Sequence, residues 1–566
     1  MPYRPLPSRT SKIATCAIGL FIAFTSLSQT QSQEKQISSE SLFSANRISS
    51  IEIEIPPKDW DFIRQQSRSF SESLGKETAE SPFKYVKGDV TIDGHKIEDV
   101  GIRKKGFLGS LNVDRPSLKI KFDKYKDQDP VDGLDRLTLN NNNQDPSRVC
   151  QYLSYKLFRE SGTRSPRCGF AKVSVNGKYL GIYSNVDSVR PIFLEREFGD
   201  GTGDCFEGTI TDFFPDWVRK FEAKNKKASY KDLKKIAAVL APAELDQNEL
   251  KKLLNLDAFI QFWAMESLIG FWDGYCSNQN NFFIYQDPSD SKFYFIPWGT
   301  DSAFTISFPI PPYRISPKSA HAKAILPNKL YRLPEIQSQY FETLNKFLDE
   351  HWDEPRLLAE MDRLENMLKE HVMPSNSKFS TSMKSFRRFI KNRRSSLVRE
   401  FKDAPPELRS REKKPPYFTE TGNAKINFST QWFTETPDNE IPAGDVKLKF
   451  SRDGNQISLN NVSVYAERSK APSQDKIKPP TIVITGKDET SGKTLTIAVS
   501  IPNEQFKPSE NSKVSVSGLL LVNGIFNPSQ MEMIDGTAVL ESASTEPGAS
   551  VEGLLELKIK KWKASD

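Results

Sequence analysis

The period of the apolar and polar pattern changes several times along the chain. Residues 51–55 alternate strictly between Ile and Glu, which predicts a strand with one buried face. Residues 85–102 and 169–198 each contain two apolar runs joined by Asp-Gly or Asn-Gly, and both patterns predict β-hairpins. Between the hairpins, Asp145 followed by Pro predicts the start of a helix with an apolar face.

The pattern becomes helical further along and then returns to short alternating runs. Residues 253–271 are strongly apolar and predict a buried helix, and residues 334–402 keep apolar positions three and four apart. After a linker at 405–416, the alternating runs are Val446–Phe450, Ile457–Val464, Thr481–Thr485, Thr494–Ile501, Val514–Val522 and Leu554–Lys560. We therefore predict an α+β fold followed by an all-β, sandwich-like C-terminal domain over residues 417–566.

The N-terminus has the order of features found in secretory signal peptides. Three basic residues precede an apolar run at 13–24, and small residues follow at 26–28. The run is too short for a comfortable membrane span, and no other segment is long and apolar enough to span a bilayer. We expect residues 1–28 to be a cleaved signal peptide, with no transmembrane anchor afterwards and a secreted, periplasmic or cell-envelope location.

Composition excludes some classes of function. A net charge of +6 over 566 residues is small, so nucleic-acid binding is not expected. The chain has five cysteines without a Cys-x-x-Cys motif and only four histidines, which argues against a zinc site. Four of these cysteines follow the signal peptide and could pair, but their connectivity cannot be derived from sequence.

The candidate chemistry is concentrated in residues 267–304. An apolar helix ends just before Asp273, three Asn residues follow at 278–281, and a predicted hairpin brings the chain back to Asp301. This order places hard oxygen ligands together, as magnesium with a nucleotide phosphate requires. Protein kinases use an Asp, an Asn and a second Asp in the same order. On spacing alone, an ordinary polar turn between helix and strand is the favoured interpretation.

This stretch resembles the signature of the CotH kinase family, the spore-coat-protein-H-like atypical protein kinases. Its Asp, its Asn before a hairpin and its Ile-Pro-Trp-Asp-x-Asp end are matched by Asp273, Asn281 and residues 296–301. The chain departs from the family at Gly299, where the signature has its first Asp. The resemblance implies that Asp273 is catalytic, that Asn281 and Asp301 hold Mg²⁺, and that ATP is the phosphoryl donor.

A second match lies in residues 101–122, where small residues in a loop between two strands allow backbone N–H groups to approach phosphate. The family has a similar Arg/Lys-Gly-x-x-Ser segment followed by a basic strand. The implied nucleotide contacts are Arg103, Gly106, Ser110, Arg115, Lys119 and Lys121. Whether the phosphate cation is Arg115, Lys119 or Lys121 stays open, and a solvated strand face is an equal alternative for any single lysine.

Further matches extend the resemblance to about residues 51–401. The family order of strand, Asn, Asp-x-Ser, Arg and helix is matched at 140–148, where we interpret Asp145 mainly as a helix cap. The family motif Asn-Gly-x-Tyr-x-Gly-x-Tyr is present at 176–183, and the Glu that follows it in the family corresponds to Asp187, another implied nucleotide-site residue. We therefore predict a CotH kinase-like domain over residues 33–404.

Two hypotheses of function follow. In the first, the chain is an exported atypical protein kinase that transfers the ATP γ-phosphate to Ser, Thr or Tyr hydroxyls of secreted or surface proteins. In the second, it is a catalytically impaired structural or binding protein of the cell envelope or outer coat, and Gly299 marks lost chemistry. The C-terminal domain could bind a glycan or protein ligand, although positioning the kinase-like domain is the simpler role.

Overall fold

The computed structural model describes residues 37–305, 317–434, 444–469, 478–509, 512–525 and 532–563. The predicted signal peptide lies outside these ranges, and the predicted domain boundaries at 404 and 416 stay predictions. Within the described residues, Cys150, Cys168, Cys205 and Cys276 are all buried and unpaired. None of the helices in this described part has the length and apolar character needed to cross a membrane.

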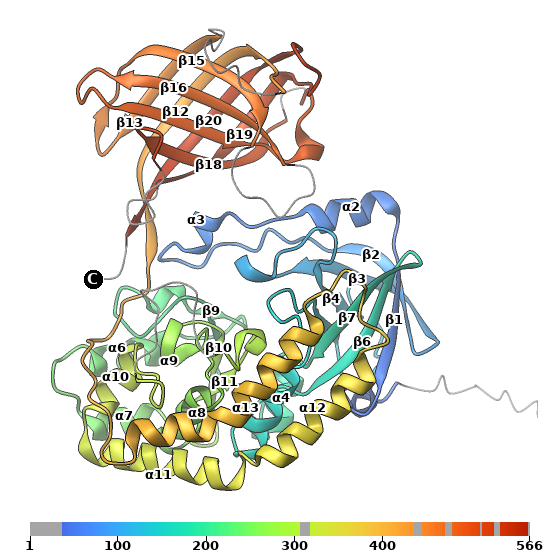
Figure 1. The fold of residues 1–566 in the computed structure, drawn as a ribbon, viewed down its shortest axis with the longest axis vertical. Helices are drawn as coiled ribbons and strands as arrows, with labels where there is room; N and C mark the ends of the chain where they lie inside the picture. Colours follow the sequence, from blue (N-terminus) through green and yellow to red (C-terminus); the bar gives the residue numbers. More distant parts are fainter. Residues whose placement is uncertain are drawn as a thin grey trace, which may run out of the picture. The chain divides into compact units, whose positions relative to one another are not determined.

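The N-terminal half contains a closed seven-stranded barrel, drawn in blue to teal in Figure 1. Its strands follow the order β1 (Ile48–Glu54), β2 (Val86–Ile92), β3 (His95–Lys105), β4 (Ser117–Lys121), β5 (Arg136–Asn140), β7 (Lys178–Val186) and β6 (Cys168–Val175). Neighbouring strands are antiparallel, and a parallel pairing of β1 with β6 closes the ring. In β1 the predicted alternation is present, since Ile51 and Ile53 are buried in the barrel core.

Short helices flank these strands: α1 (Ser39–Phe43), α2 (Pro57–Gln65), α3 (Phe70–Ser73), α4 (Cys150–Glu160) and α5 (Pro191–Phe198). The helix predicted to start at Asp145 starts five residues later, at Cys150. Arg148 has a left-handed backbone with φ of +66°, so the chain turns once before the helix begins. Asp145 still serves this helix start, because its carboxylate accepts the backbone N–H groups of Ser147 and Cys150 at 2.9 Å each.

A four-stranded sheet with the order β11-β10-β8-β9 follows the barrel in sequence. Its strands are β8 (Cys205–Gly208), β9 (Glu222–Ala223), β10 (Phe282–Asp287) and β11 (Lys292–Pro297). The helices of this region are α6 (Lys231–Leu240), α7 (Gln247–Leu253), α8 (Leu256–Leu268), α9 (Tyr275–Asn278), α10 (Ile325–Tyr331), α11 (Pro334–Glu350), α12 (Glu354–Leu368) and α13 (Phe379–Phe401). In the described residues before β12 (Tyr417–Gln431), 3₁₀ turns lie at Leu108–Ser110, Val218–Lys220 and Thr300–Ser302.

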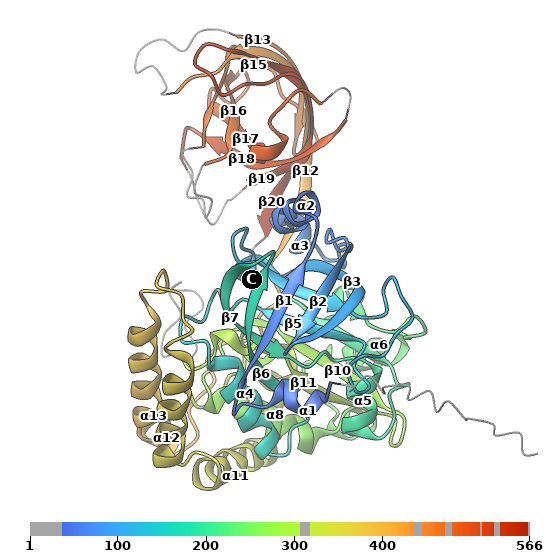
Figure 2. The ribbon, with the colours of Figure 1, turned by 90° about the vertical axis from the view of Figure 1, so that its right-hand side faces the viewer.

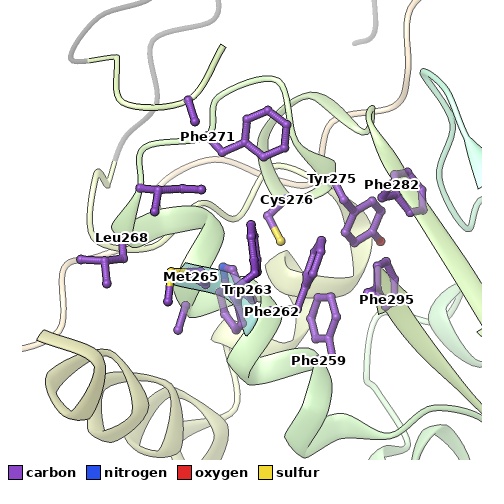
Figure 3. Packing of buried hydrophobic residues seen from close by; sticks show 14 of the residues in the cluster. Phe259, Phe262, Trp263, Met265, Leu268, Phe271, Tyr275, Cys276, Phe282 and Phe295 are labelled. Atoms are coloured by element: carbon purple, nitrogen blue, oxygen red, sulfur yellow. The ribbon is translucent and has the colours of Figure 1, made fainter. Parts of the chain in front are cut away.

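Aromatic side chains join α8 to the hairpin of β10 and β11 (Figure 3). The ring of Phe295 on β11 lies 4.9 Å from that of Phe259 on α8 and 4.8 Å from that of Tyr275 on α9. The Tyr275 ring is also 4.6 Å from Phe282 on β10. Such contacts stabilise a core beyond the area that they bury. They fix the elements on both sides of Asp273, which lies between α8 and α9.

The C-terminal residues form an all-antiparallel sheet of nine strands, in the order β14-β13-β12-β20-β19-β18-β17-β16-β15. The bounds are β12 (Tyr417–Gln431), β13 (Asp445–Arg452), β14 (Asn455–Gln456), β15 (Leu459–Arg468), β16 (Pro480–Asp488), β17 (Thr494–Ser500), β18 (Val514–Val522), β19 (Glu532–Ser542) and β20 (Ser550–Lys563), with a 3₁₀ turn at Asn503–Gln505. The all-β prediction is confirmed, and the strands belong to one continuous sheet instead of two facing ones. Figure 2 shows this sheet curving round on itself. Its buried apolar residues form one core cluster.

Candidate functional site

A cavity of about 500 Å³ is lined by β3 and β4 of the barrel and by β8, β10 and the loops around them. Its lining is rich in charge, with more basic than acidic side chains. The basic residues are Arg68, Arg103, Lys105, Lys119, Arg190, Lys220 and Lys224, and the carboxylates are Glu207, Glu222, Asp273 and Asp301. A polar cavity of this size with excess positive charge suits a polyanionic small molecule.

Asp273 is held in this cavity by three amide side chains. Its Oδ1 accepts hydrogen bonds from Nδ2 of Asn278 at 2.7 Å and of Asn280 at 3.1 Å. Its Oδ2 accepts one from Nδ2 of Asn281 at 2.9 Å. Burial raises the pKa of Asp273 to about 6, although the three amides act in the opposite direction. The carboxylate is thus fixed in position and titrates close to neutral pH, as a general base requires.

The Asn run that follows Asp273 has an unusual backbone. Gln279 and Asn281 are left-handed, with φ of +56° and +54°, a conformation that costs most residues about 1 kcal/mol and that Asn tolerates best. This backbone turns the amides of Asn278, Asn280 and Asn281 toward one carboxylate. The buried Oδ1 of Asn280 is left without a hydrogen-bond partner among the described residues, so an acceptor is available for a bound ligand or water.

Asp301 lines the same cavity at the start of the 3₁₀ turn after β11. Burial, and next the charges of Asp273 and Asp145, raise its pKa to about 7 against the opposing effect of Lys105. No Lys, Arg or His in the described ranges lies within ion-pair distance of Asp301. The carboxylate is therefore short of positive charge.

The donor set around Asp273 and Asp301 suits a hard cation. The oxygens available are two carboxylates and the amide oxygens of Asn280 and Asn281, which are ligands that Mg²⁺ accepts together with water and phosphate. Within the described residues, no group of three or more His, Cys, Asp and Glu side chains is arranged to hold a metal by itself. A metal here would depend on amide oxygens, water and the phosphates of a nucleotide to complete its coordination.

Lys119, on β4, supplies an amino group without an ion-pair partner to the cavity. In the described residues its side chain makes neither an ion pair nor a hydrogen bond to protein. Burial lowers its pKa well below the usual value, and the nearby cations Arg103, Arg190 and Lys105 lower it further. By contrast, Lys224 is neutralised by Glu207 and by Glu222 at 2.6 Å. Lys119 is thus the lysine of this cavity best suited to an added anion.

The loop between β3 and β4 closes next to Lys119. Gly106 has a φ of +141°, and a Cβ atom there would lie 2.9 Å from Oγ of Ser110. That hydroxyl accepts the backbone N–H of Phe107 at 3.0 Å, so Ser110 closes the loop instead of facing a ligand with a free group. Arg103 also lines the cavity, and its guanidinium lies 5.2 Å from the centre of the Tyr85 ring.

Lys105 and Glu207 are among the charged groups of the cavity that were not found from sequence. Lys105 donates a hydrogen bond to Oδ1 of Asn140 and lies 5.8 Å from the ring centre of Trp298, and burial lowers its pKa to about 8. Its position two residues after Arg103 in an alternating strand was a usable signal. Burial opposes the ionisation of Glu207, but adjacent Lys224 outweighs burial and lowers the pKa. No motif marked Glu207.

The family comparison matches the part of the chain that builds this cavity. Residues 102–402, more than half of the chain, match the family model described as CotH kinase protein. The chain belongs to the CotH kinase protein family. The predicted family and the α+β fold class are thereby confirmed, and the match includes Asp273, Asn281, Asp301 and Lys119.

Individual relatives of this CotH protein are distant. Inner spore coat protein H of Bacillus subtilis (strain 168) is 27% identical over 188 residues, covering 30% of this chain and 51% of the relative. Invasin CotH3 of Rhizopus delemar is 23% identical over 189 residues, covering 30% of this chain and 31% of the relative. The chain thus spans about a third to a half of the length of the curated relatives that it matches.

Among solved structures, the Helicobacter pylori proinflammatory kinase CtkA aligns with 50% of this chain and 93% of its own length. The sequence identity is 10% and the TM-score is 0.22. A score this low supports no conclusion beyond the similarity itself.

Three residues that the CotH resemblance implied as nucleotide contacts do not line the cavity. The Arg115 side chain donates to backbone carbonyls, Lys121 pairs with Asp123 at 3.2 Å, and Asp187 pairs with Arg196 at 2.7 Å and with Arg167 at 3.0 Å. Each of these side chains thus makes its contacts outside the cavity. The candidate site therefore consists of Asp273, Asn281, Asp301, Lys119, Arg103 and the loop of Gly106 and Ser110, together with Lys105.

Proposed function

We propose that this chain is an atypical protein kinase that transfers the γ-phosphate of ATP to hydroxyl groups of an exported protein. The observation that carries the proposal is one cavity of about 500 Å³ that is lined both by the unpaired cation Lys119 and by the buried carboxylate Asp273. Phosphoryl transfer needs these two features at opposite ends of one site, namely cations at the phosphates and a carboxylate at the acceptor hydroxyl.

Each group has a role that follows from its chemistry. Lys119 and Arg103 attract the phosphates, and Lys105 adds charge near Asp301. Asp273 orients the Ser, Thr or Tyr hydroxyl and accepts its proton, and its pKa of about 6 keeps it ionised near neutral pH. Asn278 and Asn280 hold the carboxylate still. Positioning and electrostatics supply most of the rate enhancement in such reactions.

Asp301 and the amide oxygen of Asn281 would hold Mg²⁺, because both residues line the cavity beside Asp273. When bound, it would neutralise phosphate charge. Asp301 is suited to a cation, since its raised pKa of about 7 reflects burial among other carboxylates without an ion pair.

One observation favours the second hypothesis, a structural or binding protein of the envelope or coat. Gly299 replaces the first Asp of the family signature, and the space beside it is filled by the Asn281 side chain. In that case the CotH fold would persist with a weakened metal site. Export to the periplasm, envelope or medium, and a glycan or protein ligand for the C-terminal sheet, belong to both hypotheses.

The experiment is calorimetric titration of the full chain with ATP, with and without Mg²⁺, beside the Asp301→Ala and Asp273→Ala variants. We expect Mg²⁺-dependent binding that falls at least ten-fold in Asp301→Ala and changes little in Asp273→Ala. Phosphotransfer to a mixture of secreted proteins should be lost in Asp273→Ala. Absence of ATP binding in the unmodified chain would refute the kinase proposal and favour the structural protein.

A further inference from the structure

A second cavity has a volume of about 150 Å³. It shares no lining residue with the cavity of Lys119 and Asp273 that we propose binds ATP, called the nucleotide cavity below. Its lining consists of Arg115, Arg148, Gly181 and Ile182, together with the segment 372–376 that precedes α13. The volume is about five times the ~30 Å³ that one water molecule occupies in the liquid. The cavity can therefore hold a small tetrahedral ion and a few waters, but not a nucleotide.

The two arginines in this cavity bond only to backbone carbonyls. Arg115 donates from Nε to Leu180 at 2.6 Å and from Nη2 to Asn141 at 2.9 Å and Ile182 at 3.1 Å. Arg148 is 8% exposed, and its Nη1 donates to Asn141 at 3.0 Å and to Asn142. Neither forms an ion pair with a described carboxylate, and Nε and Nη2 of Arg148 have no hydrogen-bond partner in the described ranges. A guanidinium carries five N–H donors, so donors remain for a ligand.

The surroundings do not cancel this positive charge. Asp145 is the carboxylate that acts on Arg148, but its oxygens already accept hydrogen bonds from Ser147 and Cys150. Burial, and next the neighbouring Arg115, lower the pKa of Arg148 to about 10. The guanidinium of Arg115 also lies 5.1 Å from the ring centre of Tyr183. Two adjacent cations thus share a small cavity without a counter-charge.

The walls of the cavity are held in place by specific contacts. The hydroxyl of Tyr179 donates to the carbonyl of His371 at 2.5 Å, and Nδ2 of Asn376 donates to the carbonyl of Pro146 at 3.0 Å. Gly181 has a φ of +103°, and a Cβ atom there would lie 3.2 Å from Cγ of Met373. These contacts keep the segment 372–376 over the arginines, and the missing side chain at Gly181 leaves the space between them open.

We propose that this cavity binds a phosphate-type oxyanion through Arg115 and Arg148. A tetrahedral oxyanion accepts the forked donors of arginine in pairs and supplies the missing counter-charge. Two sources offer this chemistry: free inorganic phosphate, and a phosphoserine at Ser375, an exposed residue that lines the cavity. The proposal does not depend on kinase activity, because binding is measured without ATP.

The first test uses inorganic phosphate as the probe, with calorimetry and thermal unfolding of the full chain. The Ser375→Glu variant places a carboxylate at the cavity, and Ser377→Glu places the same charge two residues away at an exposed position outside the lining. We expect phosphate to bind the unmodified chain and Ser377→Glu alike. Ser375→Glu should bind phosphate at least ten-fold more weakly and unfold at a higher temperature without phosphate.

A second pair of variants separates this cavity from the nucleotide cavity. Arg148→Gln should weaken phosphate binding at least ten-fold, and Lys119→Met should leave it within about two-fold. The reverse pattern would assign the phosphate to the nucleotide cavity and overturn the proposal, as would equal binding by all variants. Should Arg148→Gln fail to fold, the comparison of Ser375→Glu with Ser377→Glu still decides the question.

The two sources of phosphate are distinguished by mass spectrometry of the purified chain. Phosphate on residue 375, removable by a phosphatase with a fall in the unfolding temperature, identifies phosphoserine as the occupant. An unmodified Ser375 with measurable binding of inorganic phosphate identifies the free ion. An unmodified Ser375 without any binding of inorganic phosphate would contradict the proposal.

Discussion

At the residue scale, Gly299 and Asn281 compete for the same space. Gly299 has a φ of +54°, and a Cβ atom there would lie 2.6 Å from Oδ1 of Asn281. Any side chain at residue 299 must therefore displace an amide that holds the Asp273 carboxylate. The space that an Asp side chain at position 299 would need is occupied here by the side chain of Asn281.

We predict that Gly299→Ala lowers the free energy of unfolding by about 1–2 kcal/mol, because alanine is strained in the left-handed region. Gly299→Asp should cost less, since Asp tolerates that region better, and the added carboxylate should tighten Mg²⁺-dependent ATP binding. Urea unfolding and calorimetry measure the two effects. In an Asn281→Ala background the steric part of the cost should disappear, and an unchanged cost there would show that the two side chains do not compete.

Lys119 offers a second prediction at this scale. Its charge is partly buried and unpaired, so Lys119→Met should leave the unfolding midpoint unchanged or raise it. The same change should weaken ATP binding about ten-fold, equal to ~1.4 kcal/mol, because a phosphate contact is lost. Lys121→Met is the matched control, since Lys121 pairs with Asp123 and does not line the cavity. Equal effects of both variants on ATP binding would contradict the assignment.

The candidate site was predictable where its residues are close in sequence. Asp273, Asn281 and Asp301 belong to one helix, hairpin and turn, so local pattern brings them together. Glu207 joins them only because β8 pairs with β10, a contact between segments far apart in the chain. Arg115 and Lys119 are four residues apart, yet they serve different cavities because the chain turns into β4 between them.

At the element scale, Glu266 connects the end of α8 to the start of α9. Its Oε1 accepts the backbone N–H of Tyr275 at 2.9 Å, and its Oε2 accepts that of Cys276 at 2.8 Å. A Cβ atom at Gly274 would lie 2.3 Å from that carboxylate, so the turn requires glycine. The buried carboxylate of Glu266 is thus paired with backbone groups beside Asp273.

This arrangement predicts a pH dependence of stability. Burial raises the pKa of Glu266 from 4.5 to about 8, so the folded state binds the proton more tightly than the unfolded state does. Its contribution to stability is present in full below about 4.5 and is lost as pH rises through about 8. As pH rises from about 4.5 to about 8, the free energy of unfolding of the unmodified chain should fall relative to that of Glu266→Gln. The fall should be at most ~1.4 kcal/mol per pH unit. Parallel pH profiles for the two chains would contradict the raised pKa.

Elements with a clear period were predicted well, and those that depend on partner strands were not. The strict alternation of residues 51–55 overlaps β1, which ends at Glu54, and residues 514–522 coincide with β18. β12 was missed, because Gly and Asn interrupt its alternation and its pairing with β20 supplies the order. The long pairing of β12 with β20 also joins the strands into one sheet. Short alternating runs in a sequence cannot distinguish one continuous sheet from two facing sheets.

At the scale of the whole molecule, the nucleotide cavity is shared by two parts of the CotH fold that are distant in sequence. Lys119 comes from β4 of the barrel, and Asp273 and Phe283 come from the segment that ends in β10. A nucleotide that contacts both must stabilise them together, because a ligand that binds only the folded state adds its binding free energy to folding. At a free ATP concentration one hundred times its dissociation constant, the added stability amounts to ~2.7 kcal/mol.

Hydrogen exchange tests whether ATP engages both parts. A non-hydrolysable ATP analogue with Mg²⁺ should slow the exchange of backbone amides in β3 and β4 and also in β10 and the loop of Asp273, because opening either part would release the ligand. Strands β16–β18 of the C-terminal sheet line no part of the cavity and serve as the internal control. Slowing confined to the barrel would mean that phosphates are held without the catalytic carboxylate, which is the behaviour expected of a binding protein and not of a kinase.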